Sequence, residues 1–281
     1  MADQAVRRPR NPHRAESWQP TALRRVQVRS VEPLTPELVR VTLEGDELGE
    51  FGADAGGPDL VPAVCSPSFD DVVVFCLPDP DTGEVILPVP APGGGLGHPP
   101  GGAALVREYT VRSLRDGALA VDLVRHASGA GVRWLESVRP GDALTIVGPR
   151  VSRALPAVDR MLAVGDATAL PALARLIEER PPALALDALA AVPDPSALPP
   201  SLLPAVSPVD ADRVRVRVVA AVPGSADELI NAMAAVELPA GFAWVAGESG
   251  MVTAVRRHLL ARGQEPDRVQ FTGYWRLGGP L

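Results

Sequence analysis

The segment Arg107-Glu108-Tyr109-Thr110 indicates most directly what kind of domain and binding site this chain contains. On a β-strand, Arg107 and Tyr109 point to one face and the other two residues point to the opposite face. A planar isoalloxazine ring needs an aromatic face to stack on, and a pyrophosphate needs a bidentate cation. The tyrosine, the arginine and the hydroxyl of Thr110 therefore suit a flavin, although an ordinary amphipathic strand also fits these four residues.

Short apolar segments separated by turn residues surround this strand. They alternate at period two or read as apolar runs, at residues 24–28, 39–43, 71–77, 119–124 and 143–147. This pattern predicts an antiparallel β-barrel over residues 21–150. The Pro- and Gly-rich segment 88–102 is expected to be an irregular loop, and residues 85–87 are expected to form a hairpin strand after the Thr82-Gly83 turn.

The pattern changes near residue 155. Strand-like segments then alternate with helix-like segments, beginning with a buried strand at 161–165 and a helix at about 169–180. The segment 184–192 fits either a strand or a helix. Because alternating strands and helices form parallel sheets with crossover helices, residues 155–281 are expected to form an α/β domain.

Composition excludes several classes of function. The 281 residues carry a net charge of −7, so nucleic acid is not an expected partner. All 27 basic residues are arginine, which excludes Schiff-base chemistry on lysine. Cys65 and Cys76 are too few for a disulfide framework and do not have the spacing of metal ligands.

The same sequence predicts where the protein acts. No apolar run approaches the ~18 residues of a membrane span, and the N-terminal arginines are not followed by the apolar stretch of a signal peptide. We therefore expect a cytoplasmic protein without a membrane partner, either a monomer or a small homo-oligomer. Residues 1–20 are polar and are expected to be a disordered N-terminus.

A second candidate site follows the strand at 119–124. Its members are small residues and their neighbours, namely His126, Gly129, Ala130, Gly131, Val132 and Trp134. Small residues let backbone N–H groups approach a phosphate at the start of a helix. A strand-to-helix turn that only requires glycine explains the segment equally well.

A third candidate site lies at strand ends of the α/β domain, where ligands bind in open α/β sheets. Asp166 and Thr168 follow the buried strand at 161–165, and Thr168 could offer its hydroxyl to a nucleotide or only cap the next helix. Glu248 could accept a hydrogen bond from a ribose or a nicotinamide amide, or only cap its own helix. Trp275 could be a core residue or a cover over a cofactor ring.

The sequence does not decide two features of a nucleotide site, namely the role of three arginines and the position of an acidic residue. Arg213, Arg215 and Arg217 share one strand face, which is either a solvated surface or a site for a 2′-phosphate. The acidic residue that commonly binds a ribose 2′-hydroxyl cannot be placed, because the secondary structure of residues 184–212 is ambiguous.

Taken in order, these segments resemble the siderophore-interacting protein family, the flavin-dependent ferric-siderophore reductases. The similar stretches span about residues 21–281. They are REYT (107–110), the H-x-x-G turn with Trp134, RPGDALTIVGPR (139–150), GDATALPALARLIEE (165–179), WVAGESG (244–250) and GYWRLGG (273–279).

The resemblance implies a ferredoxin-reductase-like architecture, in which an FAD-binding β-barrel at 21–150 precedes an NAD(P)-binding-like α/β domain at 155–281. By matching position, Arg107, Tyr109 and Thr110 are expected to hold FAD, and Tyr109 and Thr110 are the expected catalytic residues. The resemblance places His126 and residues 129–132 near the pyrophosphate of FAD. It places Thr168 and Glu248 on the nicotinamide side.

The resemblance also implies an activity. NAD(P)H, or a reduced ferredoxin in some members, reduces the flavin, and single electrons then pass to the Fe(III) of a bound siderophore. The protein needs no metal ligands of its own, because the flavin carries out the redox step.

Three departures from the family pattern keep an alternative open. The phosphate turn, usually Gly-Pro-Ala-Ser, reads GAGV at 129–132; no lysine is available to attract an anionic siderophore; and the loop at 88–102 precedes the flavin strand. The alternative is a flavin-binding biosynthetic enzyme that uses the same fold in a non-redox or pericyclase-like reaction, without nicotinamide turnover.

Overall fold

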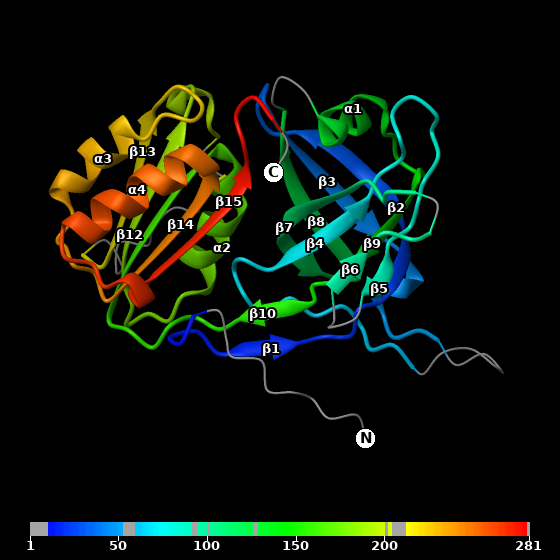
Figure 1. Ribbon diagram of the computed structural model, residues 1–281, viewed down its shortest axis with the longest axis horizontal. Helices are drawn as coiled ribbons and strands as arrows, with labels where there is room; N and C mark the ends of the chain where they lie inside the picture. The colour runs from blue at the N-terminus through cyan, green and yellow to red at the C-terminus, as the bar shows by residue number, and fades with distance from the viewer. Residues whose placement is uncertain are drawn as a thin grey trace. The chain divides into compact units, whose positions relative to one another are not determined.

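The computed structural model describes residues 11–52, 60–91, 95–100, 102–125, 129–199, 202–203 and 212–279. The chain divides into two compact units, one of residues 18–152 and one of residues 1–17 with 153–281. β1 (Glu16–Trp18) and β10 (Val151–Arg153) form a two-stranded sheet, and the chain passes from one unit to the other within these strands (Figure 1).

The unit of residues 18–152 is a closed barrel with strand order β2-β3-β8-β7-β4-β9. All neighbouring strands are antiparallel. The strands are β2 (Leu23–Pro33), β3 (Leu38–Glu44), β4 (Val72–Cys76), β7 (Val106–Arg115), β8 (Ala118–Val124) and β9 (Ala143–Val147). Apolar residues at alternate positions, such as Val26 and Val28 of β2, fill the interior. The predicted antiparallel barrel is confirmed.

Two local predictions in this unit were wrong. Residues 85–87 form no strand, because each barrel strand already has two partners and offers no free edge. Within the segment expected to be irregular, β5 (Val89–Ala91) and β6 (Gly95–Gly97) instead pair as a small antiparallel hairpin.

The barrel unit also contains the short helices η1 (Asp46–Leu48) and α1 (Ala130–Ser137). The α1 residues Trp134 and Leu135 belong to the hydrophobic core of the barrel. Helix α1 therefore packs against the barrel and places its first turn beside it.

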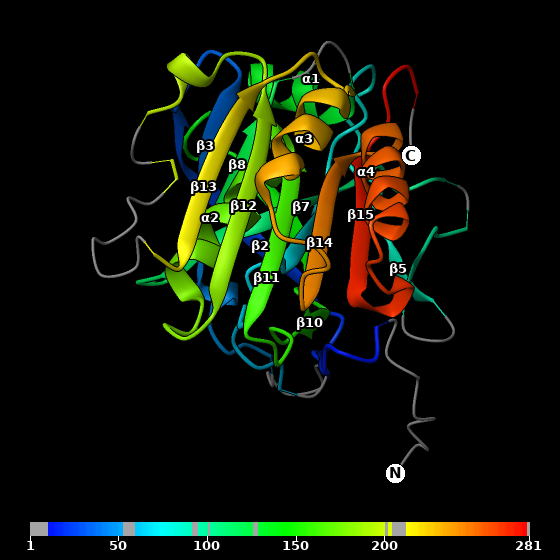
Figure 2. The same ribbon diagram turned by 90° about the vertical axis from the view of Figure 1, so that its left-hand side faces the viewer.

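The second unit holds a parallel five-stranded sheet with strand order β13-β12-β11-β14-β15. Its strands are β11 (Arg160–Asp166), β12 (Ala185–Val192), β13 (Val214–Ala220), β14 (Phe242–Glu248) and β15 (Val269–Trp275). Helices α3 (Asp227–Ala232) and α4 (Ser249–Ala261) cover one face, and α2 (Leu170–Glu179) lies on the other (Figure 2). The short helices are η2 (Ala167–Ala169), η3 (Pro195–Ala197), η5 (Met233–Ala235) and η6 (Pro266–Arg268).

The predicted α/β architecture is confirmed, and the ambiguous segment at 184–192 is strand β12. It pairs with β11 on one side and with β13 on the other, which explains why seven of its eight residues are buried. Fully buried parallel strands read as continuous apolar runs, so periodicity alone does not distinguish them from helices.

Residues 11–18 differ from the predicted disorder. Arg14 is fully buried, and its Nε donates to the carbonyl of Ala154 at 2.8 Å while Nη1 donates to Oε1 of Gln270 at 2.9 Å. A buried guanidinium must keep its hydrogen-bond acceptors, because losing them is costly. This residue therefore anchors the segment before β1.

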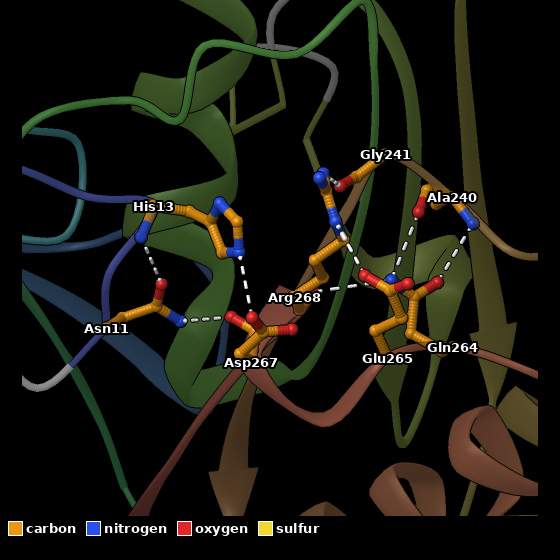
Figure 3. A network of polar contacts seen from close by, with 8 residues as sticks. All are labelled: Asn11, His13, Ala240, Gly241, Gln264, Glu265, Asp267 and Arg268. Atoms are coloured by element: carbon orange, nitrogen blue, oxygen red, sulfur yellow. Dashed lines mark hydrogen bonds and ion pairs between the residues drawn. The ribbon is translucent and has the colours of Figure 1, made fainter.

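A second set of polar contacts holds the same segment (Figure 3). Asn11 Nδ2 donates to the backbone carbonyl of Asp267 at 3.0 Å, and His13 Nε2 lies 3.3 Å from the carboxylate of Asp267. Nearby, Gln264 bonds both the N–H and the carbonyl of Ala240, at 2.9 and 3.0 Å. The contacts of Asn11 and His13 with Asp267 fasten the N-terminal segment to the turn that precedes β15.

None of the helices in the described part of the chain is long and apolar enough to cross a bilayer.

Candidate cofactor and nucleotide sites

β7 presents Arg107 and Tyr109 on the barrel-facing side. In the antiparallel pair with β4, Tyr109 lies opposite Val73 and Arg107 lies opposite Phe75. Directly opposed residues share a face, and both β4 partners belong to the barrel core. Arg107 and Tyr109 therefore share a face, as the two-residue period predicts, and Thr110 lies buried on the other face.

The ring of Tyr109 is held by aromatic contacts. It meets Phe75 edge-on, with centroids 4.9 Å apart and planes at 62°. Phe75 in turn meets Trp134 of α1 at 5.6 Å and 78°. Such edge-to-face pairs fix ring orientation, so Tyr109 is a positioned, half-buried aromatic residue.

Gly131, in the first turn of α1, approaches Tyr109 more closely than any other residue type could. A Cβ at position 131 would lie 2.2 Å from the Tyr109 hydroxyl. The structure thus brings together two segments that the sequence only suggested separately.

Replacing Gly131 tests this close approach. Gly131→Ala forces the Tyr109 ring out of its aromatic contacts, and we expect the free energy of unfolding to fall by about 1–3 kcal/mol. Urea unfolding followed by circular dichroism measures the change. Gly97→Ala is the matched control in the same unit, because its Cβ would meet no atom nearer than 3.5 Å. Equal stability of both variants would contradict the predicted contact.

Burial raises the pKa of Tyr109 to about 12, and the nearby positive charge of Arg107 partly opposes this rise. The unfolded value is about 10, so the folded state holds the phenolic proton more tightly. The resulting stability is fully present below pH 10 and is lost as pH rises through 12. We expect the wild-type protein to lose more stability than Tyr109→Phe between pH 9 and pH 11, as measured by urea unfolding. An identical loss in both proteins would contradict the assignment.

Arg107 and the start of α1 together suit an anion. The side chain of Arg107 is exposed, its Nη1 donates only to the carbonyl of Val106 at 2.7 Å, and no described carboxylate pairs with it. Helix α1 begins after Gly129, and none of the described side chains caps its first backbone N–H groups at residues 130–132. Such N–H groups and an arginine are the usual ligands of a phosphate. His126 lies outside the described residues.

In the α/β unit, Asp166 is the centre of a hydrogen-bond network at the end of β11. Its Oδ1 accepts from the backbone N–H and the hydroxyl of Thr168, at 2.8 and 2.5 Å. Its Oδ2 accepts from the N–H of Glu248 and from Nε1 of Trp275, both at 2.8 Å. Asp166 therefore ties the ends of β11, β14 and β15 together, a role that the sequence indicated only through its position after a buried strand.

Glu248 caps α4, which is one of the two alternatives that the sequence left open. Its Oε2 accepts from the N–H of Met251 at 2.8 Å, and its Oε1 accepts from the N–H of Leu277 at 3.1 Å. Trp275 is half-buried rather than a full core residue. The predicted residues Asp166, Thr168, Glu248 and Trp275 thus lie together at one edge of the sheet.

Comparison with known proteins identifies the family. Residues 27–153 match the model of the siderophore-interacting FAD-binding domain, and residues 158–278 match that of the siderophore-interacting protein. An Escherichia coli (strain K12) protein named NADPH-dependent ferric-chelate reductase is 30% identical over 275 residues, which are 95% of this chain and 97% of that protein. The chain belongs to the siderophore-interacting protein family.

Solved structures of this family have the same architecture. A siderophore utilization protein from T. fusca is 31% identical with a TM-score of 0.78, over 95% of this chain and 98% of that one. The siderophore-interacting protein SipS from Aeromonas hydrophila shares the fold at 24% identity and a TM-score of 0.69, over 92% and 93% of the two chains. The predicted ferredoxin-reductase-like fold is confirmed.

Proposed function

We propose that this protein is an FAD-dependent ferric-siderophore reductase, which passes electrons from NAD(P)H to Fe(III) and releases Fe(II). The observation that carries the proposal is the group formed by Arg107, Tyr109 and the uncapped first turn of α1. In a member of this family, that group offers a cation, an aromatic ring and backbone N–H donors on one side of the barrel.

These residues fit FAD. Arg107 is free to bind a pyrophosphate, because its guanidinium bonds only a neighbouring carbonyl. Gly131 has no Cβ, so the Tyr109 ring can lie against the first turn of α1, whose N–H groups no described side chain caps. Thr110, on the same strand, supplies a hydroxyl. When bound, FAD accepts a hydride from a nicotinamide and can release its electrons one at a time.

At the nucleotide side, Thr168 and Glu248 are positioned by Asp166. The Thr168 hydroxyl donates its proton to Asp166, so its oxygen lone pairs are available to accept a hydrogen bond. A nicotinamide carboxamide offers such a donor. Asp166 and Trp275 act as positioning residues, since both are engaged in hydrogen bonds within the protein.

The substrate iron needs no ligand from the protein. Hard oxygen donors of a siderophore hold Fe(III) far better than Fe(II), so one-electron reduction loosens the iron. Among the described residues, no group of three or more His, Cys, Asp and Glu residues could hold a metal ion.

The proposal also assigns the parts of the chain. FAD is held by residues 21–150 and the nicotinamide nucleotide by residues 155–281. The protein acts in the cytoplasm as a monomer or a small homo-oligomer, with a ferric siderophore and neither nucleic acid nor membrane as its partner. The net charge of −7 supports the exclusion of nucleic acid.

Anaerobic spectroscopy tests the proposal. We expect the purified protein to take up FAD, NADH or NADPH to bleach the flavin band near ~450 nm, and a ferric siderophore to restore it. A flavin that neither nucleotide reduces would instead favour the non-redox biosynthetic alternative. A protein that takes up no FAD would overturn both.

A further inference from the structure

The loop that follows β12 carries the carboxylate of Asp194, which has no role in the sites described above. Ala191 of β12 is in register with Asp166 of β11, and Asp194 follows two residues after the end of β12. Asp194 therefore lies at the same carboxyl edge as the Asp166–Thr168 turn, after the adjacent strand. The assignment of β12 as a strand resolves a segment that the sequence left ambiguous.

The carboxylate of Asp194 is exposed, and its oxygen Oδ1 accepts hydrogen bonds within the protein. Its Oδ1 accepts from the N–H and the hydroxyl of Ser196, at 2.9 and 2.6 Å. Among the described residues, Ser196 is the only one whose side chain donates a hydrogen bond to Asp194, and the backbone N–H of Ala197 makes a weaker contribution, so Oδ2 can accept a hydrogen bond from a ligand. The bonds from the hydroxyl and the N–H of Ser196 lower the pKa of Asp194, which keeps the group ionised at neutral pH.

The segments that follow β12, β13 and β14 carry no cationic side chain. The sequence contains no arginine or lysine at 181–212 or at 218–255, which includes the residues that follow β12, β13 and β14. A negatively charged group bound at this edge would face carboxylates without compensation from those segments.

The three arginines of the β13 segment are engaged elsewhere. Arg215 forms a bidentate pair with Asp187, at 2.7 and 3.1 Å. Arg217 donates to the carbonyl of Ala232, the last residue of α3, at 3.0 Å. Arg213 donates to the carbonyl of Ala183, before β12, at 3.3 Å. These contacts do not support the 2′-phosphate site that the sequence left open for this strand face.

The strand order of this sheet is that of dinucleotide-binding sheets. In sheets of the order 3-2-1-4-5, the turn after the first strand receives the pyrophosphate of a dinucleotide, and an acidic residue further along binds the ribose 2′-hydroxyl. Here β11, β12 and β13 are the first three strands. We infer that Asp194 binds the 2′-hydroxyl of an adenosine ribose and that this protein selects NADH over NADPH.

The selection rests on the proposed function and has a simple physical cause. A free 2′-hydroxyl can donate a hydrogen bond to an ionised carboxylate, and such charge-assisted bonds are strong. A 2′-phosphate brings about −1.5 to −2 charges against Asp194 and has no donor to offer it. The chain would then differ in nucleotide choice from the Escherichia coli relative, whose name specifies NADPH.

Binding of redox-inactive fragments tests the inference apart from turnover. ADP-ribose and its 2′-phosphorylated form lack the nicotinamide ring, so calorimetric titration of the full-length protein measures recognition of the adenosine half alone. We expect ADP-ribose to bind about tenfold to a hundredfold more tightly than its 2′-phosphate, as for one charge-assisted hydrogen bond replaced by like-charge repulsion.

Two variants assign the effect to one carboxylate. Asp194→Asn removes the charge and keeps the shape, and the preference should fall to within about threefold, which is less than one ordinary hydrogen bond. Asp212→Asn is the control, because it removes the same charge from an exposed residue just before the start of β13 and should keep the preference.

The outcomes separate the two levels of the proposal. Equal or tighter binding of the 2′-phosphorylated fragment, or an unchanged preference in Asp194→Asn, would overturn the inference and leave the reductase standing. Failure of both fragments to bind would overturn the inference together with the use of a nicotinamide nucleotide.

Discussion

Arg107→Ala is expected to weaken the binding of FAD by about 10- to 100-fold, the value of one charge-assisted hydrogen-bond pair to a phosphate. The side chain is exposed, bonds only the carbonyl of Val106, and shares a strand face with Tyr109. Its removal therefore costs the binding site its cation without breaking an ion pair of the fold. Flavin fluorescence during titration of the FAD-free protein measures the dissociation constant.

Arg115→Ala is the control for this prediction. Arg115 is also an exposed arginine of β7, but it lies at the opposite end of the strand. We expect the FAD affinity of the Arg115→Ala variant to remain within about twofold of the wild-type value, as for a screened charge far from the ligand. Equal affinity losses in both variants would show that net charge, rather than Arg107 itself, attracts the flavin.

Asp166→Ala is expected to lower the free energy of unfolding by about 3–5 kcal/mol, because breaking a buried polar network leaves several donors unsatisfied. The affected donors are the N–H groups of Thr168 and Glu248 and the indole N–H of Trp275. Urea unfolding monitored by tryptophan fluorescence and by circular dichroism measures the loss.

Asp194→Ala serves as the matched control for stability. Asp194 also follows a strand of the same sheet and also caps a short 3₁₀ turn, but it is exposed and its donors come from Ser196 alone. We expect Asp194→Ala to lower the free energy of unfolding by about 1 kcal/mol, the usual contribution of such a cap. A loss as large as that of Asp166→Ala would refute the view that Asp166 joins three strand ends.

The architecture could be predicted because both units follow simple periodicities. Alternation at period two in β2 and β3 reports one buried face, and the order of strands and helices after residue 155 implies a parallel sheet. The sequence did not distinguish β12 from a helix, because a strand between two parallel neighbours is buried on both faces and does not alternate between apolar and polar residues. Its assignment required the register with β11 and β13.

The candidate sites could be predicted only in part. The face shared by Arg107 and Tyr109 follows from their spacing, but the contact between Tyr109 and Gly131 depends on how α1 packs against the barrel. The burial of Arg14 was not predictable, because its acceptors come from residues more than a hundred positions away. Local sequence carries no signal of such long-range partners.

The stoichiometry of electron transfer tests the central claim most directly. With FAD bound and oxygen excluded, a ferric siderophore, a ferrous-iron indicator and a nicotinamide nucleotide are mixed with the protein, and Fe(II) formed is compared with nucleotide oxidised. A hydride carries two electrons and Fe(III) accepts one, so we expect two Fe(II) for each nucleotide oxidised. Fe(II) formation should require FAD, and at limiting FAD its rate should be strongly reduced in Arg107→Ala. Nucleotide oxidation that does not depend on ferric iron, or the absence of Fe(II) from a flavin-loaded protein, would contradict it.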